Sequence, residues 1–514
     1  MTDIEINEDF KKALDLAECL NKNLFITGRA GTGKSTLLKY FREHTQKKIA
    51  VIAPTGVAAV NIGGQTVHSF FGFRPDITVN KVERDYKKVR KAKLYAQLDA
   101  LVIDEISMVR ADLLDCVNTF LKMHGRVKGK PFGGIQMIFF GDLYQLPPVV
   151  TSSEKEIFED VYKSPYFFNA NVMNEITLEI VELNKIYRQK DGTFIDILNS
   201  VRNKSIADNL LDVLNSRLDP LFEIPDNDFY IYLTTTNAKA DLINNERLNK
   251  LKTPEFQFDA NITGKFDEKC APAPISLYLK AGAHIMLVNN DKKGRYINGT
   301  VGKLIKINQK EDTLTVQLSS GKKIEVYPYT WEMYRFQYNE KDKRIESETV
   351  GSFTQFPIIL AWAITIHKSQ GKTFEKAIID MDKGAFTHGQ TYVALSRCVS
   401  LEGLVLKKPI EERHIMVDWR VSKFLTEYTY KKVNAVFSIE SKTKIIESAI
   451  RDDKKITITY LKANDTKTQR VVKPFETGEM FYKDIPFLGF RGFDELMGEE
   501  RVFKTERVLE IKIV

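Results

Sequence analysis

The stretch from residue 23 to residue 40 constrains the fold more than any other part of this chain. A short apolar run, residues 24–27, leads into the glycine loop 28–35, and a helical pattern follows to residue 40. Glycines allow such a loop to curl around a polyphosphate, so that backbone N–H groups and the helix N-terminus face its charge. Lys34 then reaches the β- and γ-phosphates, and Ser35 ligates a magnesium ion. The expected nucleotide-binding residues are Gly28, Ala30, Gly31, Thr32, Gly33, Lys34, Ser35 and Thr36.

Three more apolar runs follow, at residues 48–53, 100–103 and 135–140, and each ends in a polar cluster. Because these runs are continuous and alternate with helical patterns, they predict a parallel sheet covered by helices on both faces. Ligands collect at the carboxyl ends of the strands in such sheets. We therefore predict an α/β fold with its nucleotide site at this edge of the sheet.

The polar clusters contain the residue types that nucleotide hydrolysis needs. Asp104 can hold the magnesium ion through water, while Glu105 orients and deprotonates the attacking water. Gln145 follows the fourth strand and is suited to sensing the γ-phosphate. A guanidinium from another lobe would complete the site, because charge develops on the γ-phosphate during transfer. Arg188 and Arg397 are candidates, but their spacing alone does not separate them from the other basic residues.

The first unit, residues 1–174, is followed by a second series of strands and helices. Apolar runs and helical patterns in residues 175–282 and 351–430 predict a second α/β unit. Short alternating runs separated by turn residues predict a small antiparallel β-barrel at 283–350, inserted into that unit. Residues 431–455 are polar and charged and are expected to be a linker. The strand-rich residues 456–514 predict a separate small domain.

The composition is typical of a globular protein. With 43% hydrophobic and 28% charged residues, the chain has no apolar run long enough to cross a bilayer. Residues 1–8 are acidic and polar, unlike a secretory or transit segment, which favours the cytoplasm. The net charge of +8 is compatible with a polyanionic partner but does not require one. Wide spacing favours reduced thiols over disulfides or a zinc site for the four cysteines, Cys19, Cys116, Cys270 and Cys398.

Eight motifs in order make the chain similar to a known family. They are residues 28–35, 53–59, 64–70, 104–108, 141–148, 187–189, 363–371 and 392–397. With them the chain resembles the Pif family of DNA helicases, in the superfamily-1B group that also includes the RecD-type enzymes. The resemblance covers about residues 8–428, and residues 105–126 look like the signature that separates Pif helicases from RecD relatives. It implies two RecA-like lobes with ATP between them, a wedge insertion at about 72–98 and the inserted barrel.

The resemblance also assigns roles to single residues. Lys34 and Ser35 take the phosphate and metal roles, and Asp104 and Glu105 take the metal and base roles. Gln145 contacts the γ-phosphate. Arg188 and Arg397 become arginine fingers from the second lobe. The expected single-strand track consists of groups that can grip phosphates without reading bases, namely Thr55, Thr66, His68, Ser69, Thr365, His367 and Lys368.

Three aspects of the resemblance leave alternatives open. Phe70, Phe71 and Phe73 could stack on bases or pack in the core. The strongly basic segment 73–98 could contact a polyanion or form a solvated helix face. Phe10 occupies the position where the family often has a glutamine that reads the adenine edge, so the preference for ATP over other nucleotides is open.

Beyond residue 455 the chain resembles a different module. Short stretches around Tyr460, Arg470, Phe490 and Arg501 look like a WYL domain, a small strand-rich module of bacterial regulators, although the Trp-Tyr-Leu triplet that names it is absent. The resemblance implies sensing of a ligand or a single strand. The residues expected to take part are Tyr460, Arg470, Arg501 and Arg507.

We therefore expect an ATP-driven 5′-to-3′ DNA helicase that uses ATP and Mg²⁺. Its expected partners are single-stranded DNA and forked or tailed duplex DNA, and G-quadruplexes or RNA–DNA hybrids stay open as substrates. We expect a monomer in the bacterial cytosol, associated with the nucleoid, with no membrane partner. The alternative is a nucleotide-gated single-strand-binding regulator that signals through the C-terminal domain. The motor is favoured by four intact residues, since a switch needs little hydrolysis: Glu105, Gln145, Arg188 and Arg397. A P-loop kinase would leave the second lobe unexplained.

Overall fold

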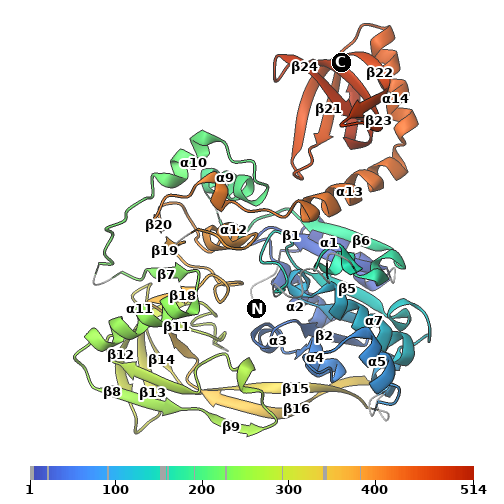
Figure 1. The fold of residues 1–514 in the computed structure, drawn as a ribbon. Helices are drawn as coiled ribbons and strands as arrows, with labels where there is room; N and C mark the ends of the chain where they lie inside the picture. The colour runs from blue at the N-terminus through green and yellow to red at the C-terminus, as the bar shows by residue number, and fades with distance from the viewer. Residues whose placement is uncertain are drawn as a thin grey trace. The chain divides into compact units, whose positions relative to one another are not determined.

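The computed structural model describes residues 5–19, 22–89, 92–150, 158, 161–189, 191–225, 228–291, 293–339, 344–381 and 384–514. The chain divides into two compact units (Figure 1). One comprises Met1–Leu198 and Asp208–Met416, and the other comprises Asn199–Ala207 and Val417–Val514.

The larger unit contains, in its described part, a six-stranded sheet with the strand order β3-β2-β4-β5-β1-β6. Every pair in it is parallel, as the continuous apolar runs predict. Its strands are β1 (Asn23–Gly28), β2 (Ile49–Ala53), β3 (Gln65–Thr66), β4 (Ala100–Ile103), β5 (Gln136–Phe140) and β6 (Leu178–Leu183). The accompanying helices are α1 (Glu8–Cys19), α2 (Lys34–His44), α3 (Gly56–Asn61), α4 (Val67–Phe71), α5 (Val79–Asp85), α6 (Ala92–Gln97) and α7 (Ala111–His124). We call this sheet and its helices the first lobe.

The boundary predicted after residue 174 is wrong. β6 lies in the region assigned to the second unit, yet it pairs with β1 along its whole length, from Asn23 opposite Leu178 to Gly28 opposite Leu183. Val181 and Leu183 are buried in the core of the first lobe together with Leu24 and Ile26 of β1. Burial of these side chains against β1 explains why β6 completes the first sheet.

A second parallel sheet follows, with the order β18-β7-β19-β20 among the described residues. Its strands are β7 (Ile231–Thr234), β18 (Ala363–Thr365), β19 (Ala377–Asp380) and β20 (Leu404–Leu406). Asn244 connects α11 (Asn237–Lys250) to this sheet, because its side-chain amide exchanges hydrogen bonds of 2.8 and 2.9 Å with the backbone of Ala363. We call this sheet, with α11 and α12 (Gln390–Leu395), the second lobe. The predicted α/β class with two parallel-sheet lobes is confirmed.

Antiparallel strands lie between β7 and β18 in the sequence. The described part includes a five-stranded sheet of order β14-β13-β12-β11-β17, a three-stranded sheet β15-β16-β9 and the pair β10-β8. These strands are β8 (Glu255–Asp259), β9 (Asn261–Gly264), β10 (Ser276–Lys280), β11 (His284–Leu287), β12 (Val301–Asn308), β13 (Thr313–Leu318), β14 (Lys323–Val326), β15 (Tyr329–Asn339), β16 (Arg344–Gln355) and β17 (Ile358–Leu360).

We call this antiparallel region the insertion. It extends beyond the predicted limits of 283–350 at both ends, because Leu277, Leu279 and Ile358 are buried in the same core as Leu304 and Val316. The long hairpin β15–β16 runs below α4 in the view of Figure 1. It contacts the first lobe where the Phe336 N–H donates to Gln65 Oε1 at 3.0 Å.

The smaller unit is rich in strands, as predicted. Its described residues form an antiparallel sheet of order β24-β23-β22-β21-β25, preceded by two helices. These elements are α13 (Trp419–Val436), α14 (Ile439–Arg451), β21 (Ile456–Leu461), β22 (Lys467–Tyr482), β23 (Ile485–Asp494), β24 (Glu499–Lys504) and β25 (Val508–Ile513). The linker predicted at 431–455 is contradicted, since α14 buries Ile446 and Ala449 against Ile456 and Phe490 of the sheet. Its polar outer face resembled a linker, while its inner face belongs to the core.

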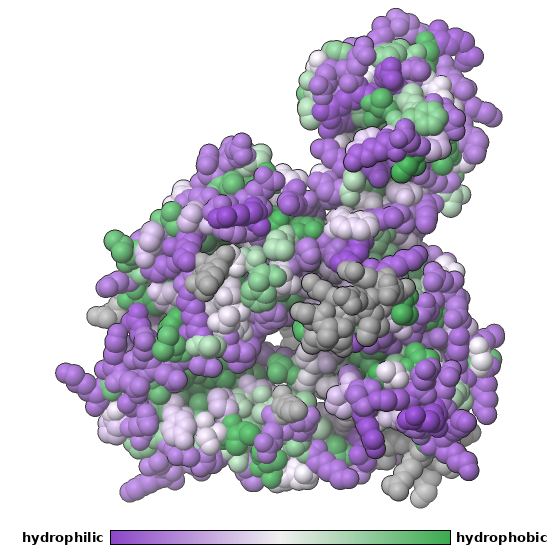
Figure 2. All heavy atoms as spheres, viewed as in Figure 1, coloured by the Kyte–Doolittle hydropathy of each residue, from purple (hydrophilic) through white to green (hydrophobic). Residues whose placement is uncertain are grey.

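Two further helices and several short 3₁₀ segments complete the described elements. The helices are α9 (Gly192–Arg202) and α10 (Asp208–Asn215). The 3₁₀ segments are Ile106–Met108, Pro131–Gly134, Phe167–Asn169, Asn171–Asn174, Glu268–Cys270, Glu412–His414 and Thr505–Arg507. No helix in the described ranges has the length and apolar character to cross a membrane. Hydrophilic residues predominate on the face drawn in Figure 2, with apolar ones scattered among them.

The described cysteines Cys116, Cys270 and Cys398 are buried free thiols. The side chain of Cys19 lies outside the part of the chain that the structure describes.

Candidate nucleotide and single-strand sites

The glycine loop connects β1 to α2 in the first lobe. Gly31 and Gly33 adopt left-handed backbone angles, with φ of 83° and 86°. A Cβ on Gly31 would lie 2.5 Å from the Cβ of Arg188, so a larger residue does not fit there. No side chain caps the N-terminus of α2, which leaves its first N–H groups directed at the loop. This is the arrangement that binds phosphate at a helix N-terminus.

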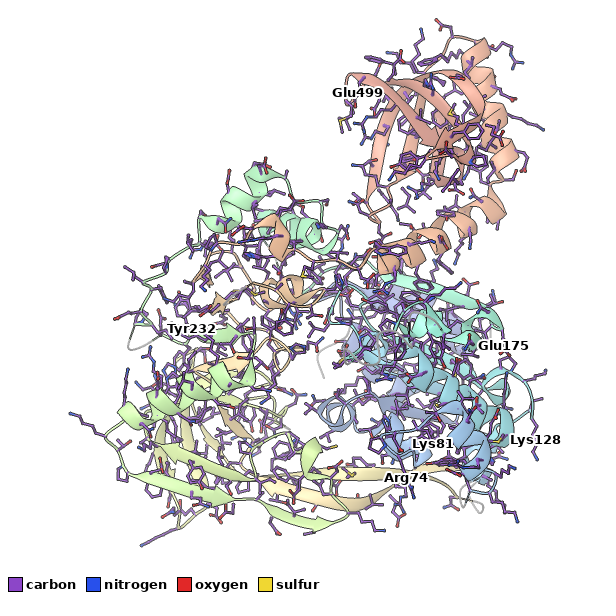
Figure 3. The ribbon with its side chains drawn as sticks, in the orientation of Figure 1. Arg74, Lys81, Lys128, Glu175, Tyr232 and Glu499 are labelled. Carbon is purple, nitrogen blue, oxygen red and sulfur yellow. The ribbon has the colours of Figure 1, made fainter. Side chains whose placement is uncertain are left out.

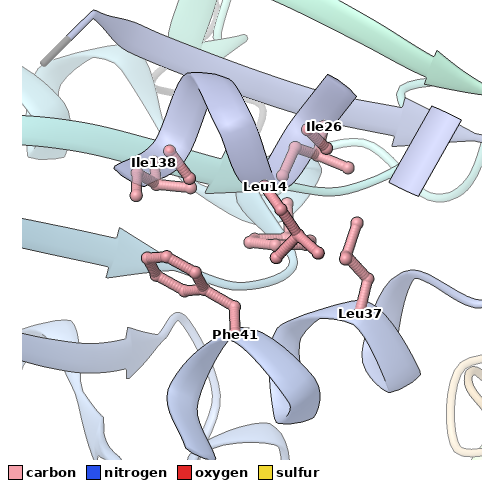
Figure 4. Close-up of a pocket in the computed structure, with 8 residues that line it drawn as sticks. Leu14, Ile26, Leu37, Phe41 and Ile138 are labelled. Atoms are coloured by element: carbon pink, nitrogen blue, oxygen red, sulfur yellow. The ribbon is translucent and has the colours of Figure 1, made fainter. Parts of the chain in front are cut away.

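Apolar packing fixes the direction of α2. Leu37 and Phe41 of α2 line one small pocket together with Ile26 of β1, Ile138 of β5 and Leu14 of α1 (Figure 4). Four of these side chains are buried in the core of the first lobe, and the partly buried Leu14 packs against it. Burying such side chains stabilises the fold by roughly 1.5–3 kcal/mol each, so the helix N-terminus has a fixed position relative to the sheet.

The loop residues hold one another by side-chain bonds. The Lys34 ammonium donates to the carbonyls of Gly28 at 2.7 Å and Arg29 at 3.0 Å. The Thr32 hydroxyl donates to the Arg29 carbonyl at 2.9 Å. Ser35 and Thr36 are exposed on the first turn of α2, while Ala30 is buried. Lys34 thus lies across the mouth of the loop, with the Ser35 hydroxyl next to it in the helix.

Two carboxylates follow β4 at the same edge of the sheet. The Glu105 N–H donates to Asp104 Oδ1 at 2.9 Å. Glu105 has a left-handed backbone, with φ of 49°, and for a residue other than glycine this strain costs roughly 1–3 kcal/mol. Burial raises the pKa of both carboxyls above the ordinary range, and the negative charge of Asp104 raises the pKa of Glu105 further. The positive charge of Lys34 opposes both shifts. A raised pKa suits Glu105 as a general base near neutral pH.

Gln145 lies between the two lobes. Its Nε2 donates to Asp142 Oδ2 at 3.2 Å, and Asp142 is 1% exposed directly after β5. On the other side lies Gly389, which precedes α12 of the second lobe. A Cβ on Gly389 would be 2.4 Å from the Gln145 carbonyl oxygen. The backbone of the second lobe therefore touches the backbone of Gln145.

The two predicted arginines differ in their surroundings. Arg188 follows β6 of the first sheet rather than a strand of the second lobe, and its guanidinium donates to the Ser396 carbonyl at 3.1 Å. Burial lowers the pKa of Arg188. Arg397 is 1% exposed and donates to the carbonyls of Val393 at 2.9 Å and of Ser369 and Lys372 at 3.3 Å.

The charges of both lobes act on Arg397. Burial, and next the positive charge of Arg188, lower the pKa of Arg397 to about 9. The negative charges of Glu105 and Asp142 act in the opposite direction. Arg397 of the second lobe is therefore within electrostatic range of the carboxylates of the first lobe.

Sequence reasoning named the motifs of three further residues here but gave them no role. The Tyr392 hydroxyl accepts a hydrogen bond of 3.0 Å from the Ala30 N–H of the glycine loop. Gln189 Nε2 donates to the carbonyls of Ser396 at 3.3 Å and Cys398 at 3.1 Å. The Asp142 carboxylate holds Gln145, as described above. Each lies in a motif quoted for the resemblance, and that membership was the available signal.

The predicted threonines of the single-strand track cap helices or turns. Thr55 Oγ1 accepts from the Ala58 N–H at 3.3 Å, Thr66 Oγ1 from the Ser69 N–H at 3.1 Å, and Thr365 Oγ1 from the Lys368 N–H at 3.2 Å. The three threonines directly follow or end β2, β3 and β18. The carboxyl ends of parallel strands in both lobes thus carry the predicted phosphate-gripping groups.

The remaining track residues differ in exposure. His68 and His367 are half-buried, and burial lowers the pKa of both imidazoles, so that they are neutral at pH 7. The His367 ring stacks on Phe386 with 6.3 Å between centroids. Ser69 and Lys368 are exposed, and the Ser69 hydroxyl accepts from Gln65 Nε2 at 3.2 Å.

Three phenylalanines left open by the sequence pack in the core. Phe70, Phe71 and Phe73 are 4%, 3% and 6% exposed. Phe71 contacts the rings of both Tyr95 and Phe120 at centroid distances of 5.8 and 5.1 Å. Rings this buried cannot stack on a base, so the packing interpretation holds for them.

Phe10, at the position of the family glutamine, is buried too. It is 3% exposed, and its ring lies 3.0 Å from the position of a Cβ on Gly33. Its N–H donates to Asn7 Oδ1 at 2.9 Å. Phe10 therefore packs beneath the glycine loop.

The basic segment carries its own acidic partners. Lys81 pairs with Asp76, and Arg84 pairs with Asp85 at 2.6 Å. Lys81 of α5 and Lys128 after α7 lie on the outer side of the first lobe (Figure 3). These pairs agree with a solvated helix face for α5.

The four residues expected to sense a ligand in the smaller unit have different environments. Arg470 is 4% exposed and pairs with the fully buried Asp494 at 2.6 Å. The Tyr460 hydroxyl accepts from the Lys504 N–H at 3.2 Å. Arg501 is exposed and pairs with Glu499 at 2.6 Å, and Arg507 is half-buried. The buried ion pair gives Arg470 a structural function.

The chain is similar to several known proteins. Residues 5–211 match the model of the PIF1-like helicase family. The ATP-dependent DNA helicase Pif1 of Bdellovibrio bacteriovorus is 30% identical, over 83% of this chain and 93% of its own length. The crystal structure of Bacteroides sp Pif1 in complex with ADP-AlF4 is 38% identical, with a TM-score of 0.76, and covers 84% of this chain and 98% of its own. The same Bacteroides protein bound to ssDNA aligns with a TM-score of 0.60 over the same shares. The chain therefore belongs to the PIF1-like helicase family, whose relatives named here include an ATP-dependent DNA helicase.

Proposed function

We propose that this chain is an ATP-dependent DNA helicase that moves 5′ to 3′ along single-stranded DNA and unwinds forked or tailed duplexes. The observation that carries the proposal is the meeting of both lobes at one site. Tyr392 and Arg397 of the second lobe lie against the glycine loop and within range of Glu105 of the first lobe. A nucleotide bound there contacts both lobes, so its hydrolysis changes the interactions through which the two lobes are held together.

Each residue then has a physical role in hydrolysis. The N-terminus of α2 and the Lys34 ammonium bind the β- and γ-phosphates. Glu105 orients the attacking water and takes its proton, and Gln145 contacts the γ-phosphate. Arg188 and Arg397 stabilise the charge that develops on the γ-phosphate. Backbone carbonyls accept hydrogen bonds from both guanidiniums, so a γ-phosphate competes with these acceptors for the two cations.

The donor set fits a magnesium ion. The exposed Ser35 hydroxyl and the Asp104 carboxylate are hard oxygen ligands, the type that Mg²⁺ prefers. When bound, the ion neutralises charge on the β- and γ-oxygens. Ser35 and Asp104 are the residues that would hold it.

The track residues give the DNA contacts. Thr55, Thr66, His68 and Ser69 of the first lobe and Thr365, His367 and Lys368 of the second lobe present hydroxyls, imidazoles and an ammonium. Such groups bind the sugar-phosphate backbone irrespective of sequence. The ssDNA-bound structure of the Bacteroides relative supports this class of partner. The 5′-to-3′ direction is part of the proposal and is inferred from the resemblance to the family. G-quadruplexes and RNA–DNA hybrids are further candidate substrates.

We also propose that the smaller unit is a WYL-like sensor for a ligand or a single strand. Its support is the strand-rich fold of residues 456–514 and the exposed side chain of Arg501 on β24, which pairs with the exposed Glu499. An exposed cation suits an anionic ligand. Arg470 is excluded from this role, because it pairs with the buried Asp494.

The test measures steady-state ATP hydrolysis with and without single-stranded DNA, for wild type and Glu105→Gln. Strand release from 5′-tailed and 3′-tailed duplexes is then followed with the same preparations. The proposal expects strong stimulation by DNA, release of the 5′-tailed substrate only, and loss of both activities in the variant. Tight DNA binding with slow, unstimulated hydrolysis and no strand release would instead indicate a nucleotide-gated binding protein.

A further inference from the structure

Three segments that are distant in the sequence meet at Lys372. The Lys372 ammonium donates to Asn298 Oδ1 at 2.6 Å, and Asn298 Nδ2 donates to Asn61 Oδ1 at 3.4 Å. Lys372 belongs to the second lobe, Asn298 to the turn before β12 of the insertion, and Asn61 to the end of α3 in the first lobe. We call Lys372, Asn298 and Asn61 the junction cluster.

Gly299 permits this approach. It adopts a left-handed backbone with φ of 97°, and a Cβ there would lie 3.4 Å from the Lys372 Cβ. A residue with a side chain would be strained in this conformation and would sit directly against the lysine. The turn before β12 is thus shaped to bring Asn298 to the ammonium.

The Lys372 ammonium has unused bonding capacity. An ammonium has three donors, and the described residues give it one side-chain acceptor, Asn298 Oδ1. Burial lowers the pKa of Lys372 to about 8, and no carboxylate of a described residue offsets this shift. A half-buried cation without a carboxylate partner is stabilised by any anion that reaches it.

The cluster continues the predicted single-strand track. Lys372 is four residues beyond Lys368 and five beyond His367, in the turn after β18. Asn61 ends α3, the helix capped by Thr55. The cluster therefore joins the part of the track on the second lobe to the part on the first.

We propose that Lys372, positioned by Asn298, is a further phosphate contact for single-stranded DNA where the strand passes from one lobe to the other. The inference rests on the proposed function, since it needs DNA to follow the track. It differs from that proposal because it adds the insertion to the DNA-binding surface and names a residue outside the predicted track.

The test measures binding of a fluorescein-labelled oligothymidylate by anisotropy over a series of salt concentrations, without nucleotide. Each phosphate contact on a single strand contributes about 0.7 to the slope of log affinity against log salt. Lys372→Gln is expected to make the magnitude of the slope smaller by about 0.7. The affinity lost relative to wild type should therefore be roughly fivefold larger at ~0.1 M salt than at ~1 M salt. Lys372→Arg should keep the slope, because it retains the charge.

Two further variants make the result specific. Asn298→Asp places a carboxylate where the amide oxygen accepts from the ammonium, so it should weaken binding and lower the slope as Lys372→Gln does. Lys310→Gln, in the exposed hairpin between β12 and β13, is the matched control and should change neither hydrolysis nor binding. Thermal melting of each variant confirms that it is folded.

The outcomes separate this inference from the proposed function. Suppose that wild type binds DNA and hydrolyses ATP in response, while Lys372→Gln keeps the wild-type slope. The junction cluster then only connects parts of the protein to one another, and the inference fails. If wild type itself shows no DNA-stimulated hydrolysis, the proposed function fails. A lowered slope in both Lys372→Gln and Asn298→Asp, with an unchanged slope in Lys310→Gln, supports the contact.

Discussion

Replacement of Gly389 by alanine is expected to hold the two lobes apart. The added Cβ would lie 2.4 Å from the carbonyl oxygen of Gln145 and 2.5 Å from that of Tyr144. Both are backbone atoms of the first lobe, so no flexible side chain can yield. Ordinary van der Waals contact for a Cβ begins near 3.4 Å, and the added Cβ would be only 2.4 Å from the Gln145 carbonyl oxygen. The lobes must therefore separate by 1.0 Å, the difference between 3.4 and 2.4 Å.

A shift of this size has a large effect on catalysis. A misplacement of about 1 Å at a reacting centre costs on the order of 100-fold in rate. We therefore expect Gly389→Ala to lower DNA-stimulated hydrolysis by about that factor. Binding of a fluorescent ATP analogue should change much less, because the glycine loop and α2 belong to the first lobe alone.

The assay needs a control for backbone strain. Gly389 has φ of 73°, and alanine in the left-handed region costs roughly 1–2 kcal/mol by itself. Gly321 has φ of 82° but no atom within 4 Å of its added Cβ, so Gly321→Ala carries the strain without the clash. If both variants lose similar thermal stability and Gly389→Ala keeps hydrolysis within twofold of wild type, the argument from lobe contact is refuted.

Three further predictions concern stability. Asp494→Asn should lower the free energy of unfolding by about 3–5 kcal/mol in urea titrations, because it leaves the buried Arg470 without its charged partner. As the control, Glu499→Gln removes the partner of the exposed Arg501 and should lower that free energy by under about 1 kcal/mol. Equal effects of the two changes would contradict this. Burial, with the positive charges of Lys303 and Arg247, lowers the pKa of His284 to about 4. The unfolded chain therefore binds the proton more tightly than the folded chain does. The free energy of unfolding should fall as the pH drops from about 6.5 toward 4. His284→Phe should weaken that pH dependence of the urea midpoint, and an unchanged dependence would count against it. Phe71→Ala should lower the free energy of unfolding by about 3–5 kcal/mol because the ring is buried in the core, and a loss of DNA affinity without loss of stability would point to base stacking instead.

Local sequence patterns predicted most of the residues at the carboxyl edge of the first-lobe sheet. The glycine loop, Asp104, Glu105 and Gln145 follow strands whose apolar runs are continuous in the sequence, and parallel strands bring their carboxyl ends together. The pairing of β6 with β1 could not be predicted in this way, because it depends on which edge of the sheet remains unpaired. The pattern of α14 was ambiguous for a related reason. Its apolar face is narrow, and only the strands that follow show what it packs against.

Side-chain roles were harder to predict than positions. Thr55, Thr66 and Thr365 lie at strand ends as expected, but their hydroxyls also cap the following backbone, which depends on the local dihedral angles. Arg397 was expected to project toward a phosphate. Its complete burial and its carbonyl partners arise from the fold of the second lobe, which no motif encodes.

The carbonyl bonds of Arg397 have a thermodynamic consequence. The carbonyls of Ser369 and Lys372 belong to the turn that also carries His367 and Lys368. A γ-phosphate that draws the guanidinium away must compete with these two acceptors, so nucleotide and turn share one cation. Binding free energies coupled in this way are reciprocal. A DNA strand that fixes the turn must change the affinity for nucleotide by the same factor by which nucleotide changes the affinity for DNA.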